Sequence, residues 1–443
     1  MKVLVLGSDG RAHALVWKLF NSPLVSEIIC MPGNGGTGQI APSVDLESDD
    51  PATIARWVFD EGVDIIVPAS SRPLQQGVVD EVVAFHVGVC GPSQRSTVLT
   101  HSRCRAKEFM LQHQLPTAPG RAFTNLATAE KYLATQPLPL CIKADHPVAG
   151  EAVYQDRHAA LVGLRTLFAA RPLEGPNDGV VIEQYLQGPR VVLSAFTDGR
   201  TAVPLLATRL YDKTDVGDQG AFAPGIGAHT GESRFAHLLR DYLHQKFILP
   251  TVEGLAKEDL PYWGILGVDC IVTSDGPRLT GLRCSLREGE AQVVLPRLED
   301  DLLPWIQAMI SQRLHDYPLP TWSPMPSVGV GLFAKGYPHH FATGGLIQGL
   351  EDLDEGVRIF HDATETPSSL TYTPRSNRSS SLLGMLVGTV PNNTLSVTGG
   401  HPLSIVVMAS TLAEAHQKAL DNAERIVFGG RSFRTDIGTK EFG

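Results

Sequence analysis

Short apolar segments alternate with helical patterns over the first hundred residues. Val3–Leu6, Ile28–Met31 and Val63–Val67 are strand-length segments dominated by apolar residues, and apolar positions at helical spacing separate them. Strands buried on both faces have such segments, and alternation of strands with helices is typical of parallel sheets. The pattern therefore predicts an N-terminal α/β domain with a doubly wound parallel sheet at residues 1–100.

The middle of the chain is predicted to form two lobes of mixed, α+β character. Residues 101–189, the first lobe, begin with a charged helix and continue as strand, helix, strand, helix, strand. Residues 190–323, the second lobe, carry longer strand signals of mostly antiparallel type. The clearest strands, Gly267–Thr273 and Arg278–Cys284, are joined at Ser274–Gly276, a sequence typical of a hairpin turn.

A proline-rich linker precedes the last unit. The linker, Pro318–Pro326, is stiff because proline fixes its own backbone angle. Residues 327–443 then combine strand signals with a long amphipathic helix at Leu412–Ile426. We therefore expect a separate C-terminal domain of mixed structure.

The composition is that of a globular protein. Hydrophobic residues make up 43% of the chain and charged residues 19%, so substantial cores can form. A net charge of −10 without a basic run argues against a nucleic acid or an anionic membrane as partner. No segment approaches the roughly 20 apolar residues that cross a bilayer, and the N-terminal apolar run is too short for a secretory signal. The six scattered cysteines favour buried thiols, so we expect a cytoplasmic location.

Two glycine-rich turns at the ends of predicted strands suit a small ligand. Gly7–His13 opens a helix, and its free backbone N–H groups and helix dipole suit an anion. Pro32–Gly38 lets a backbone approach a ligand closely, at the sheet edge where ligands bind. A plain tight turn or a flexible loop explains these glycines equally well. The candidate substrate contacts in the two turns are Asp9, Gly10, Arg11, Asn34, Gly35 and Gly36.

Further motifs extend along the chain. They include Lys107–Phe109, Ile142–Asp145, Pro250–Gly254, Phe360–Ala363 and Arg434–Gly438. Together with the two turns, they resemble the phosphoribosylamine–glycine ligase family, also called glycinamide ribonucleotide synthetase, over nearly the whole chain. The resemblance implies an ATP-grasp fold between an N-terminal α/β domain and a C-terminal domain. It also implies that glycine is joined to 5-phosphoribosylamine through a glycyl phosphate while ATP becomes ADP and phosphate.

The resemblance implies a nucleotide site with ATP as cofactor. The cations that meet the triphosphate correspond to Arg103 and Lys143, and the adenine contacts correspond to Glu183 and the backbone of Leu186. Two structural alternatives remain open. Lys143 can be a strand-end lysine that reaches water, and Glu183 can be a surface acid at the end of a strand.

Two motifs depart from the family pattern. The family has Gly-Lys-Gly in the lid over the phosphates, whereas this chain has Ala149–Glu151, and the new negative charge should weaken closure on ATP. The acceptor loop, Gln219–Gly227, keeps Gly225 and Gly227 as candidate substrate contacts. It has Phe222 in place of an asparagine, which disfavours a phosphate.

The metal position is altered as well. Phosphoryl transfer to a carboxylate needs Mg²⁺ to neutralise charge, and the family holds the metal with Glu-x-Asn on one strand. The aligned residues here are Gly281 and Arg283. Asp269 on the partner strand is the candidate metal ligand, and Glu288 and Glu290 are the candidate catalytic acids that can rebuild a site. The alternative is that Asp269 pairs with Arg283, so Mg²⁺ binding stays doubtful.

The motifs are compatible with three functions. The first is a phosphoribosylamine–glycine ligase of purine biosynthesis with impaired catalysis. The second is an ATP-grasp carboxylate–amine ligase with a changed substrate, and the third is a non-catalytic paralogue that binds a nucleotide, a partner or a small ligand. The expected ligands are small molecules, namely glycine and phosphoribosylamine or an analogue, and the protein is expected to be a monomer or a dimer.

Overall fold

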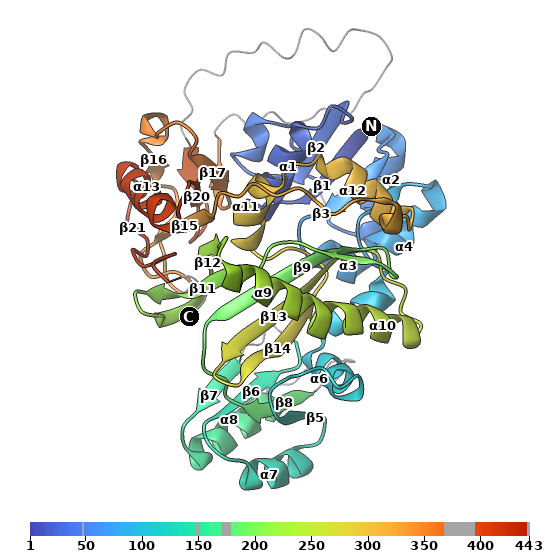
Figure 1. Ribbon diagram of the computed structural model, residues 1–443, viewed down its shortest axis with the longest axis vertical. Coiled ribbons are helices and arrows are strands. Elements are labelled where there is room, and N and C mark those ends of the chain that lie inside the picture. The colour runs from blue at the N-terminus through green and yellow to red at the C-terminus, as the bar shows by residue number, and fades with distance from the viewer. Residues whose placement is uncertain (47, 147–150, 170–178, 367–394, 441–443) are drawn as a thin grey trace.

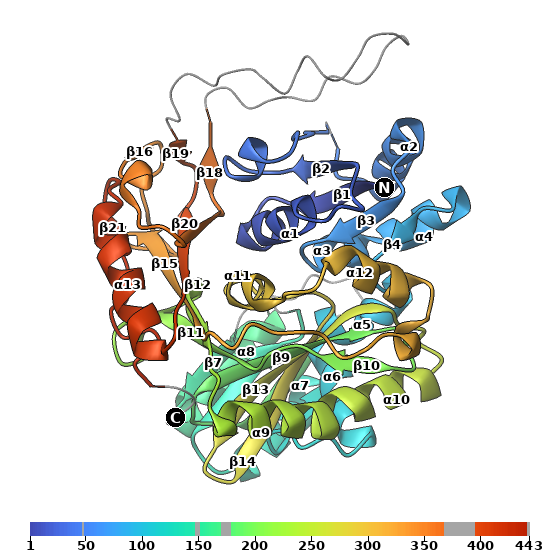
Figure 2. The same ribbon diagram turned by 45° about the horizontal axis from the view of Figure 1, so that its top comes forward.

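The computed structural model describes residues 1–46, 48–146, 151–169, 179–366 and 395–440 (Figure 1). Strands in these residues form four sheets. The first lobe, in teal, lies at one end of the molecule, and the N-terminal domain, in blue, lies beside the orange and red C-terminal strands at the other end (Figures 1 and 2). No helix within this part of the chain is long and apolar enough to cross a membrane.

The N-terminal domain is a parallel α/β unit, as predicted. Its elements are β1 (Lys2–Gly7), α1 (Gly10–Phe20), β2 (Glu27–Pro32), α2 (Pro51–Glu61), β3 (Ile65–Pro68), α3 (Arg72–Gln76), α4 (Val78–Val82) and β4 (Gly88–Val89). The strands pair in parallel in the order β2-β1-β3-β4, with Val3 between Ile28 and Ile65. The carboxyl ends of β1 and β2 therefore lead into the two glycine-rich turns at one edge of the sheet.

The first lobe is a small antiparallel sheet with its own core. Its elements are α5 (Val98–His101), α6 (Arg103–Gln112), β5 (Gly120–Phe123), α7 (Leu126–Thr135), β6 (Leu140–Ala144), β7 (Glu151–Tyr154), α8 (Arg157–Ala169) and β8 (Val180–Gln184). The sheet order is β5-β8-β6-β7. β7 is an addition to the predicted pattern. It is short and largely exposed, so it has no apolar signal that the sequence could display.

The second lobe and the C-terminal unit share one ten-stranded sheet. Its strands are β9 (Arg190–Thr197), β10 (Ala202–Pro204), β11 (Thr208–Asp215), β12 (Gln219–Thr230), β13 (Gly264–Thr273), β14 (Gly276–Arg283), β15 (Ser327–Ala334), β17 (Arg358–His361), β20 (Leu403–Met408) and β21 (Arg431–Ser432). β12 pairs antiparallel with β15, from Gly227 opposite Val330 to Thr230 opposite Ser327. The expected separate C-terminal domain is therefore joined to the second lobe by backbone hydrogen bonds.

The expectation that Gln219–Gly227 is a loop was wrong, because these residues form most of β12. The segment is rich in glycine and alanine and contains Pro224, all of which lower strand propensity. Pairing with β11 on one side and β15 on the other outweighs that propensity. The register shifts between Phe222 and Gly227, and this irregular stretch accommodates Pro224 and Gly225, whose φ is +79°.

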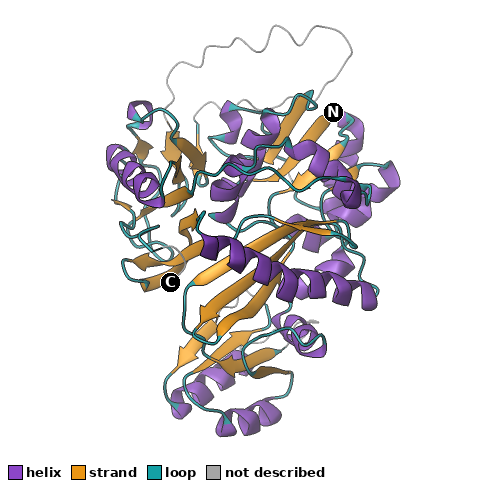
Figure 3. Ribbon diagram, viewed as in Figure 1, coloured by secondary structure: helices purple, strands orange, loops and turns teal. Residues whose placement is uncertain are grey.

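Helices cover the large sheet and connect it to the N-terminal domain. They are α9 (Arg234–Leu243), a π-helical turn (His244–Ile248), α10 (Leu249–Lys257), α11 (Glu290–Val294), α12 (Leu302–Ile310) and α13 (Leu412–Arg425). α9 and α10 run along one face of the sheet, as Figure 3 shows. The C-terminal unit also has a small sheet of β16 (Leu346–Ile347), β18 (Thr364–Glu365) and β19 (Leu395–Val397).

Candidate active site

A cavity of about 440 Å³ lies where the N-terminal domain, both lobes and the C-terminal unit meet. The charged side chains that line it are Asp9, Arg11, Arg103, Lys107, Lys143, Glu151, Glu183, Arg190, Asp269, Arg283, Arg287, Glu288 and Asp362. Both signs of charge are present, and most of these groups contact one another. The chemistry of the cavity therefore depends on which of these charges are already paired.

Glu183 is held between two lysines at the base of the cavity. Its Oε1 accepts from Lys143 Nζ at 2.8 Å, and its Oε2 accepts from Lys107 Nζ at 2.6 Å. β6 and β8 are adjacent and antiparallel, which places Lys143 and Glu183 close together. Burial would raise the pKa of Glu183, but the two lysines outweigh burial and lower it. Neither residue fits the alternatives of a water-reaching lysine or a surface acid, because both are buried.

Glu151 contacts both cations that were predicted to meet a triphosphate. Its Oε2 lies 3.5 Å from Arg103 Nη2 and 3.8 Å from Lys143 Nζ. A phosphate that binds these cations has to compete with the Glu151 carboxylate. Ala149 and Gly150, the rest of the altered lid motif, lie outside the described residues. Leu186 follows β8 in a loop and is not among the residues that line the cavity.

Asp269 is paired with arginines on both of its oxygens. Arg283 Nε donates to Oδ1 at 2.6 Å, and Arg287 Nε donates to Oδ2 at 3.1 Å. Burial would raise the pKa of Asp269, but Arg283 and Arg287 hold it well below its usual range. Gly281 lies opposite Asp269 on β14 and offers no side-chain ligand. The structure therefore has the Asp269–Arg283 pair that the sequence left as the alternative to a metal ligand.

Glu290, predicted as a catalytic acid, is fully buried and is not among the residues that line the cavity. Its Oε1 accepts from Ser194 Oγ at 2.7 Å. Its Oε2 accepts from the Arg287 backbone N–H at 2.8 Å and from Arg283 Nη1 at 3.2 Å. With all of these bonds formed, the carboxylate positions Arg283 rather than facing a substrate.

Two of the backbone N–H groups that the sequence predicted to be free in the N-terminal turn are occupied by a side chain of the turn itself. Asp9 is the N-cap of α1, and its Oδ1 accepts from the backbone N–H groups of Arg11 and Ala12, each at 3.1 Å. Asp9 Oδ2 also pairs with the Arg11 guanidinium. An aspartate is a preferred N-cap because its carboxylate satisfies these N–H groups. The side chains of Asp9 and Arg11 nevertheless line the cavity.

Gly10, Gly35 and Gly36 in the two turns are needed for close packing within the protein. A Cβ on Gly10 would collide with Glu288 and Gln292, and one on Gly36 would collide with His13 and His361. A Cβ on Gly35 would lie 2.7 Å from Leu395 Cδ2. Close packing against the C-terminal unit therefore explains Gly35 and Gly36 without a ligand.

Asn34 stabilises the second turn by hydrogen bonds. Its Nδ2 donates to the Ser8 carbonyl at 2.9 Å and to the His361 carbonyl at 2.8 Å. Its Oδ1 accepts from the backbone N–H groups of Gly36 and Thr37, each at 2.9 Å. These four bonds use the hydrogen-bonding capacity of the amide, so Asn34 fixes the turn.

Gly225 and Gly227 on β12 also face protein atoms. A Cβ on Gly225 would lie 2.7 Å from His401 Cε1, and one on Gly227 would lie 2.6 Å from Ile437 Cδ1. Phe222 is 49% exposed, is not among the residues that line the cavity, and lies with its ring 5.4 Å from the Arg190 guanidinium. Within the predicted acceptor loop, Pro224 lines the cavity directly, whereas Phe222 lies against Arg190 and Gly225 packs against His401.

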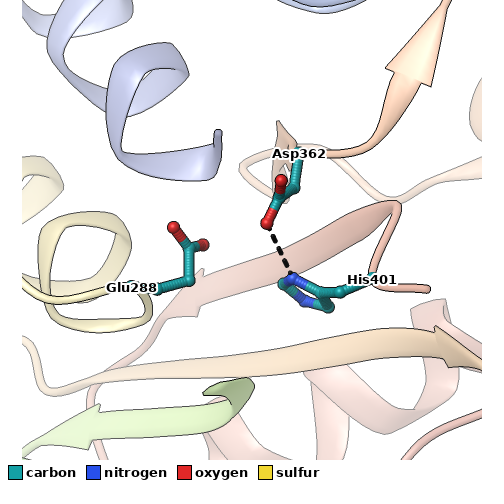
Figure 4. Close-up of side chains that lie close together, drawn as sticks. All are labelled: Glu288, Asp362 and His401. Atoms are coloured by element: carbon teal, nitrogen blue, oxygen red, sulfur yellow. Dashed lines mark hydrogen bonds and ion pairs between the residues drawn. The ribbon is translucent and has the colours of Figure 1, made fainter. Parts of the chain in front are cut away.

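Glu288 lies in a group with two residues to which the sequence analysis gave no role in the site. Figure 4 shows Glu288, Asp362 and His401 pointing toward one another, and one ligand atom of each lies within 4.8 Å of the others. Burial raises the pKa of Glu288 well above its usual range, and the nearby carboxylates of Asp362 and Asp9 raise it further. Asp362 and His401 belong to the C-terminal unit, so no local motif connects them with Glu288.

Comparisons with known proteins cover nearly the whole chain. Residues 1–100, 101–291 and 327–440 match the N domain, the ATP-grasp (A) domain and the C domain of phosphoribosylglycinamide synthetase. The phosphoribosylamine–glycine ligase of Caulobacter vibrioides is 32% identical over 441 residues, which are 99% of this chain and 98% of that protein. The corresponding ligase of Halalkalibacterium halodurans is 29% identical over 442 residues, which are 99% and 97% of the two chains.

Solved structures share the fold. The crystal structure of phosphoribosylamine–glycine ligase from Thermotoga maritima has a TM-score of 0.78 at 23% identity and covers 98% of this chain and 100% of its own. The biotin carboxylase domain of Hydrogenobacter thermophilus 2-oxoglutarate carboxylase, solved with MgADP, has a TM-score of 0.72 at 13% identity and covers 97% and 91%. At these identities the two structures establish the ATP-grasp fold alone.

Proposed function

The chain belongs to the phosphoribosylglycinamide synthetase family, and we propose that it is an ATP-dependent ligase that joins glycine to 5-phosphoribosylamine in purine biosynthesis. The observation that carries the proposal is the match of all three family domains, in order, over nearly the whole chain. The charged cavity at the junction of these domains supports it, because ligase chemistry needs a nucleotide and two small substrates in one place.

The nucleotide is assigned to the side of the cavity formed by the first lobe. Arg103, Lys143 and Lys107 supply positive charge there, and the triphosphate would displace Glu151 from the first two. The glycine carboxylate would accept the terminal phosphoryl group of ATP, and the amine of phosphoribosylamine would then displace phosphate. In this chain the cations bind and orient the phosphates, and the walls of the cavity limit access of water.

The side chains at the family's metal positions do not fit Mg²⁺. Mg²⁺ prefers an octahedral shell of carboxylate and water oxygens. Here Gly281 has no ligand atom, both oxygens of Asp269 accept from arginines, and Arg283 adds a positive charge. No step of the proposed reaction is therefore assigned to a metal at these positions, and we propose that catalysis is impaired.

One observation favours a second function, namely nucleotide binding without catalysis. Arg283 and Arg287 neutralise Asp269, and Glu151 pairs with Arg103 and Lys143, so the charges on this side of the cavity are paired without substrate. Release of ADP that depends on both glycine and phosphoribosylamine distinguishes the two functions. ADP release that is unaffected by omitting glycine would contradict the ligase proposal.

Lys143→Met is expected to weaken ADP binding by about tenfold. Lys143 is a buried cation on the side of the cavity assigned to the nucleotide, and a charge-assisted hydrogen bond to a phosphate contributes roughly 1.5–3 kcal/mol, part of which Lys107 retains. Isothermal titration of wild type and variant with ADP measures the change. Lys131→Met removes an exposed lysine of α7 and is the matched control. Equal affinities in wild type and Lys143→Met would place the nucleotide elsewhere.

ADP affinity is expected to respond little to Mg²⁺. Arg283 already supplies positive charge where the family has a metal ligand. Isothermal titration with and without EDTA tests this expectation, and a tenfold loss of affinity with EDTA, about 1.4 kcal/mol, would contradict it.

The double variant Gly281→Glu with Arg283→Asn is expected to make ADP binding depend on Mg²⁺. A Cβ on Gly281 would have no atom nearer than Asp269 Oδ2 at 3.9 Å, so a side chain fits there. The variant places a carboxylate beside Asp269 and removes one of the two arginines that neutralise it. The same titration with and without EDTA measures the change, and the single variant Gly281→Glu, which keeps Arg283, is the control.

A further inference from the structure

Glu288, Asp362 and His401 come from three separate segments and meet at the edge of the cavity. Glu288 lies between β14 and α11, Asp362 follows β17, and His401 precedes β20. One ligand atom of each side chain lies within 4.8 Å of the other two, and Figure 4 shows the two carboxylates and the imidazole converging on a common space. None of them lies on the strand that the family resemblance assigned to Mg²⁺.

The Glu288 carboxylate lacks a full set of partners. Its side chain is 11% exposed, and its Oε2 is buried without a hydrogen-bond partner. Its Oε1 accepts from Gln292 Nε2. The nearest cation is Arg11, whose Nε lies 3.7 Å from Oε2, and Arg11 is already paired with Asp9.

The charges around this group do not balance. Asp9, Glu288 and Asp362 bring three carboxylates to one corner of the cavity, and Arg11 is the cation in contact with them. Crowded, partly desolvated carboxylates repel one another, and a bound divalent cation removes that repulsion. The Oε2 of Glu288, which accepts no hydrogen bond, and the crowding of three carboxyl groups both point to a cationic ligand.

His401 is already held in the orientation of a metal ligand. Its Nδ1 lies 3.0 Å from Asp362 Oδ2, and its Nε2 lies 3.3 Å from Ser404 Oγ. Histidine ligands of metals usually donate their other ring N–H to an oxygen, which fixes the ring and its tautomer. Ser404 provides that oxygen when Nδ1 is the ligating atom.

We propose that Glu288, Asp362 and His401 bind a divalent transition-metal ion, such as Co²⁺ or Zn²⁺. An imidazole with two carboxylates suits these ions better than Mg²⁺ or Ca²⁺, which prefer oxygen ligands throughout. The neutral ring that binds the metal carries its single proton on Nε2, which donates to Ser404 Oγ. Nδ1 then offers its lone pair to the metal in place of its contact with Asp362.

A nucleophilic serine is the other function that these hydrogen bonds suggest. Ser404, His401 and Asp362 stand in the order of a hydrolase triad. Ser404 is 4% exposed on β20, between β15 and β17, and is not among the residues that line the cavity. A substrate cannot reach its hydroxyl, so Ser404 is better explained as the support for His401.

Titration of the metal-free full-length protein with Co²⁺, followed by visible absorption, tests the proposal. We expect one Co²⁺ per chain with a visible ligand-field band, and Zn²⁺ should displace it. Asp362→Asn and His401→Gln should each weaken Co²⁺ binding by at least about 100-fold. Ser404→Ala should weaken it by about tenfold, in the range found when a hydrogen-bond partner of a metal ligand is removed.

A matched control comes from a histidine–carboxylate pair elsewhere in the chain. His113 Nε2 lies 2.9 Å from Glu258 Oε1, so His113→Gln removes a similar pair outside the cluster and should leave Co²⁺ binding unchanged. Thermal melting of each variant without metal reports whether it is folded, and the conservative Asp362→Asn change keeps the test valid if His401→Gln unfolds.

Absence of a saturable Co²⁺ site in the wild-type protein would overturn the proposal. So would equal affinities in the wild type, Asp362→Asn and His401→Gln. If glycine or another primary amine binds and these same variants abolish that binding while no metal binds, the carboxylates hold a protonated amine instead. All titrations are done without nucleotide, so their outcome is independent of the proposed ligase activity.

Discussion

Replacing Asp269 by alanine is expected to lower the free energy of unfolding by about 3–5 kcal/mol, the usual cost of removing one partner of a buried ion pair. The Asp269 side chain is 5% exposed and those of Arg283 and Arg287 are 14% and 26% exposed. The variant leaves both guanidinium groups partly buried, with Glu290 as the remaining carboxylate partner of Arg283. Urea denaturation of wild type and variant measures the difference.

The pH dependence of this difference follows from the pKa of Asp269. Arg283 and Arg287 outweigh the effect of burial and hold that pKa below its value in the unfolded chain, which is about 3.9. A carboxyl group with a lowered pKa stabilises the fold above the unfolded value, and the stabilisation is lost as the pH falls toward the folded value. The difference in the free energy of unfolding between wild type and Asp269→Ala should therefore become smaller as the pH falls from about 5 to 2.

Glu108→Ala is the matched control for this prediction. Glu108 pairs with Arg105 on α6, and the two side chains are 53% and 52% exposed. Exposed pairs contribute little because water screens them. The control should leave the free energy of unfolding close to that of the wild type. If Asp269→Ala also lowered the free energy of unfolding only slightly, Arg283 and Arg287 would have to find other partners at little cost, and the prediction would be wrong.

The rate of the proposed reaction is expected to be at least about 100-fold below that of an intact family member, which corresponds to about 2.7 kcal/mol of barrier. Gly281 and the arginine-paired Asp269 do not supply a metal site, and Glu151 competes with phosphate for Arg103 and Lys143. These changes all affect how the cavity stabilises the charge of the transition state. Their effects on the rate therefore need not add. Glycine- and phosphoribosylamine-dependent ADP release measures the rate.

The ligase of Caulobacter vibrioides, assayed alongside, provides the reference rate. Similar turnover in the two proteins would contradict the expectation of impaired catalysis. If Asp269→Ala then abolished turnover in this chain, Asp269 would have to leave its arginines during the reaction and act at the reacting centre. If Asp269→Ala left turnover intact, catalysis would not depend on Asp269 of β13.

The sequence was sufficient to predict elements whose apolar spacing is set by local burial. The parallel sheet of the N-terminal domain, the β13–β14 hairpin and helix α13 follow directly from such spacing. β12 could not be predicted in the same way, because its pairing with β11 and β15 overrides its glycine-rich composition. Strand propensity depends on the neighbours that a segment finds in the fold.

The candidate site was predictable in part. Arg103, Lys143 and Glu183 do meet around one cavity, and the Asp269–Arg283 pair was foreseen as an alternative. Contacts that depend on the position of a whole domain were not foreseen. The glycine-rich turns were expected to bind a ligand because the sequence gives no sign that the C-terminal unit packs against Gly35 and Gly36.

The sequence also did not predict that Glu288 lies close to Asp362 and His401, for the same reason. These residues belong to the C-terminal unit and are separated along the sequence from Glu288, so spacing holds no signal for it. Arg287 was missed because its pairing with Asp269 depends on how the segment after β14 folds back.

The shared ten-stranded sheet determines which part of the molecule is able to move. Two hydrophobic clusters extend from the N-terminal domain into the second lobe, and β12–β15 hydrogen bonds tie that lobe to the C-terminal unit, so these three units form one stiff frame. The strands and the helices α7 and α8 of the first lobe pack around a separate core. A hinge motion of this sheet with α7 and α8 would therefore widen or narrow the cavity. It would carry Glu151, Lys143 and Glu183 together, while Asp269, Arg283 and helix α6 stay with the frame.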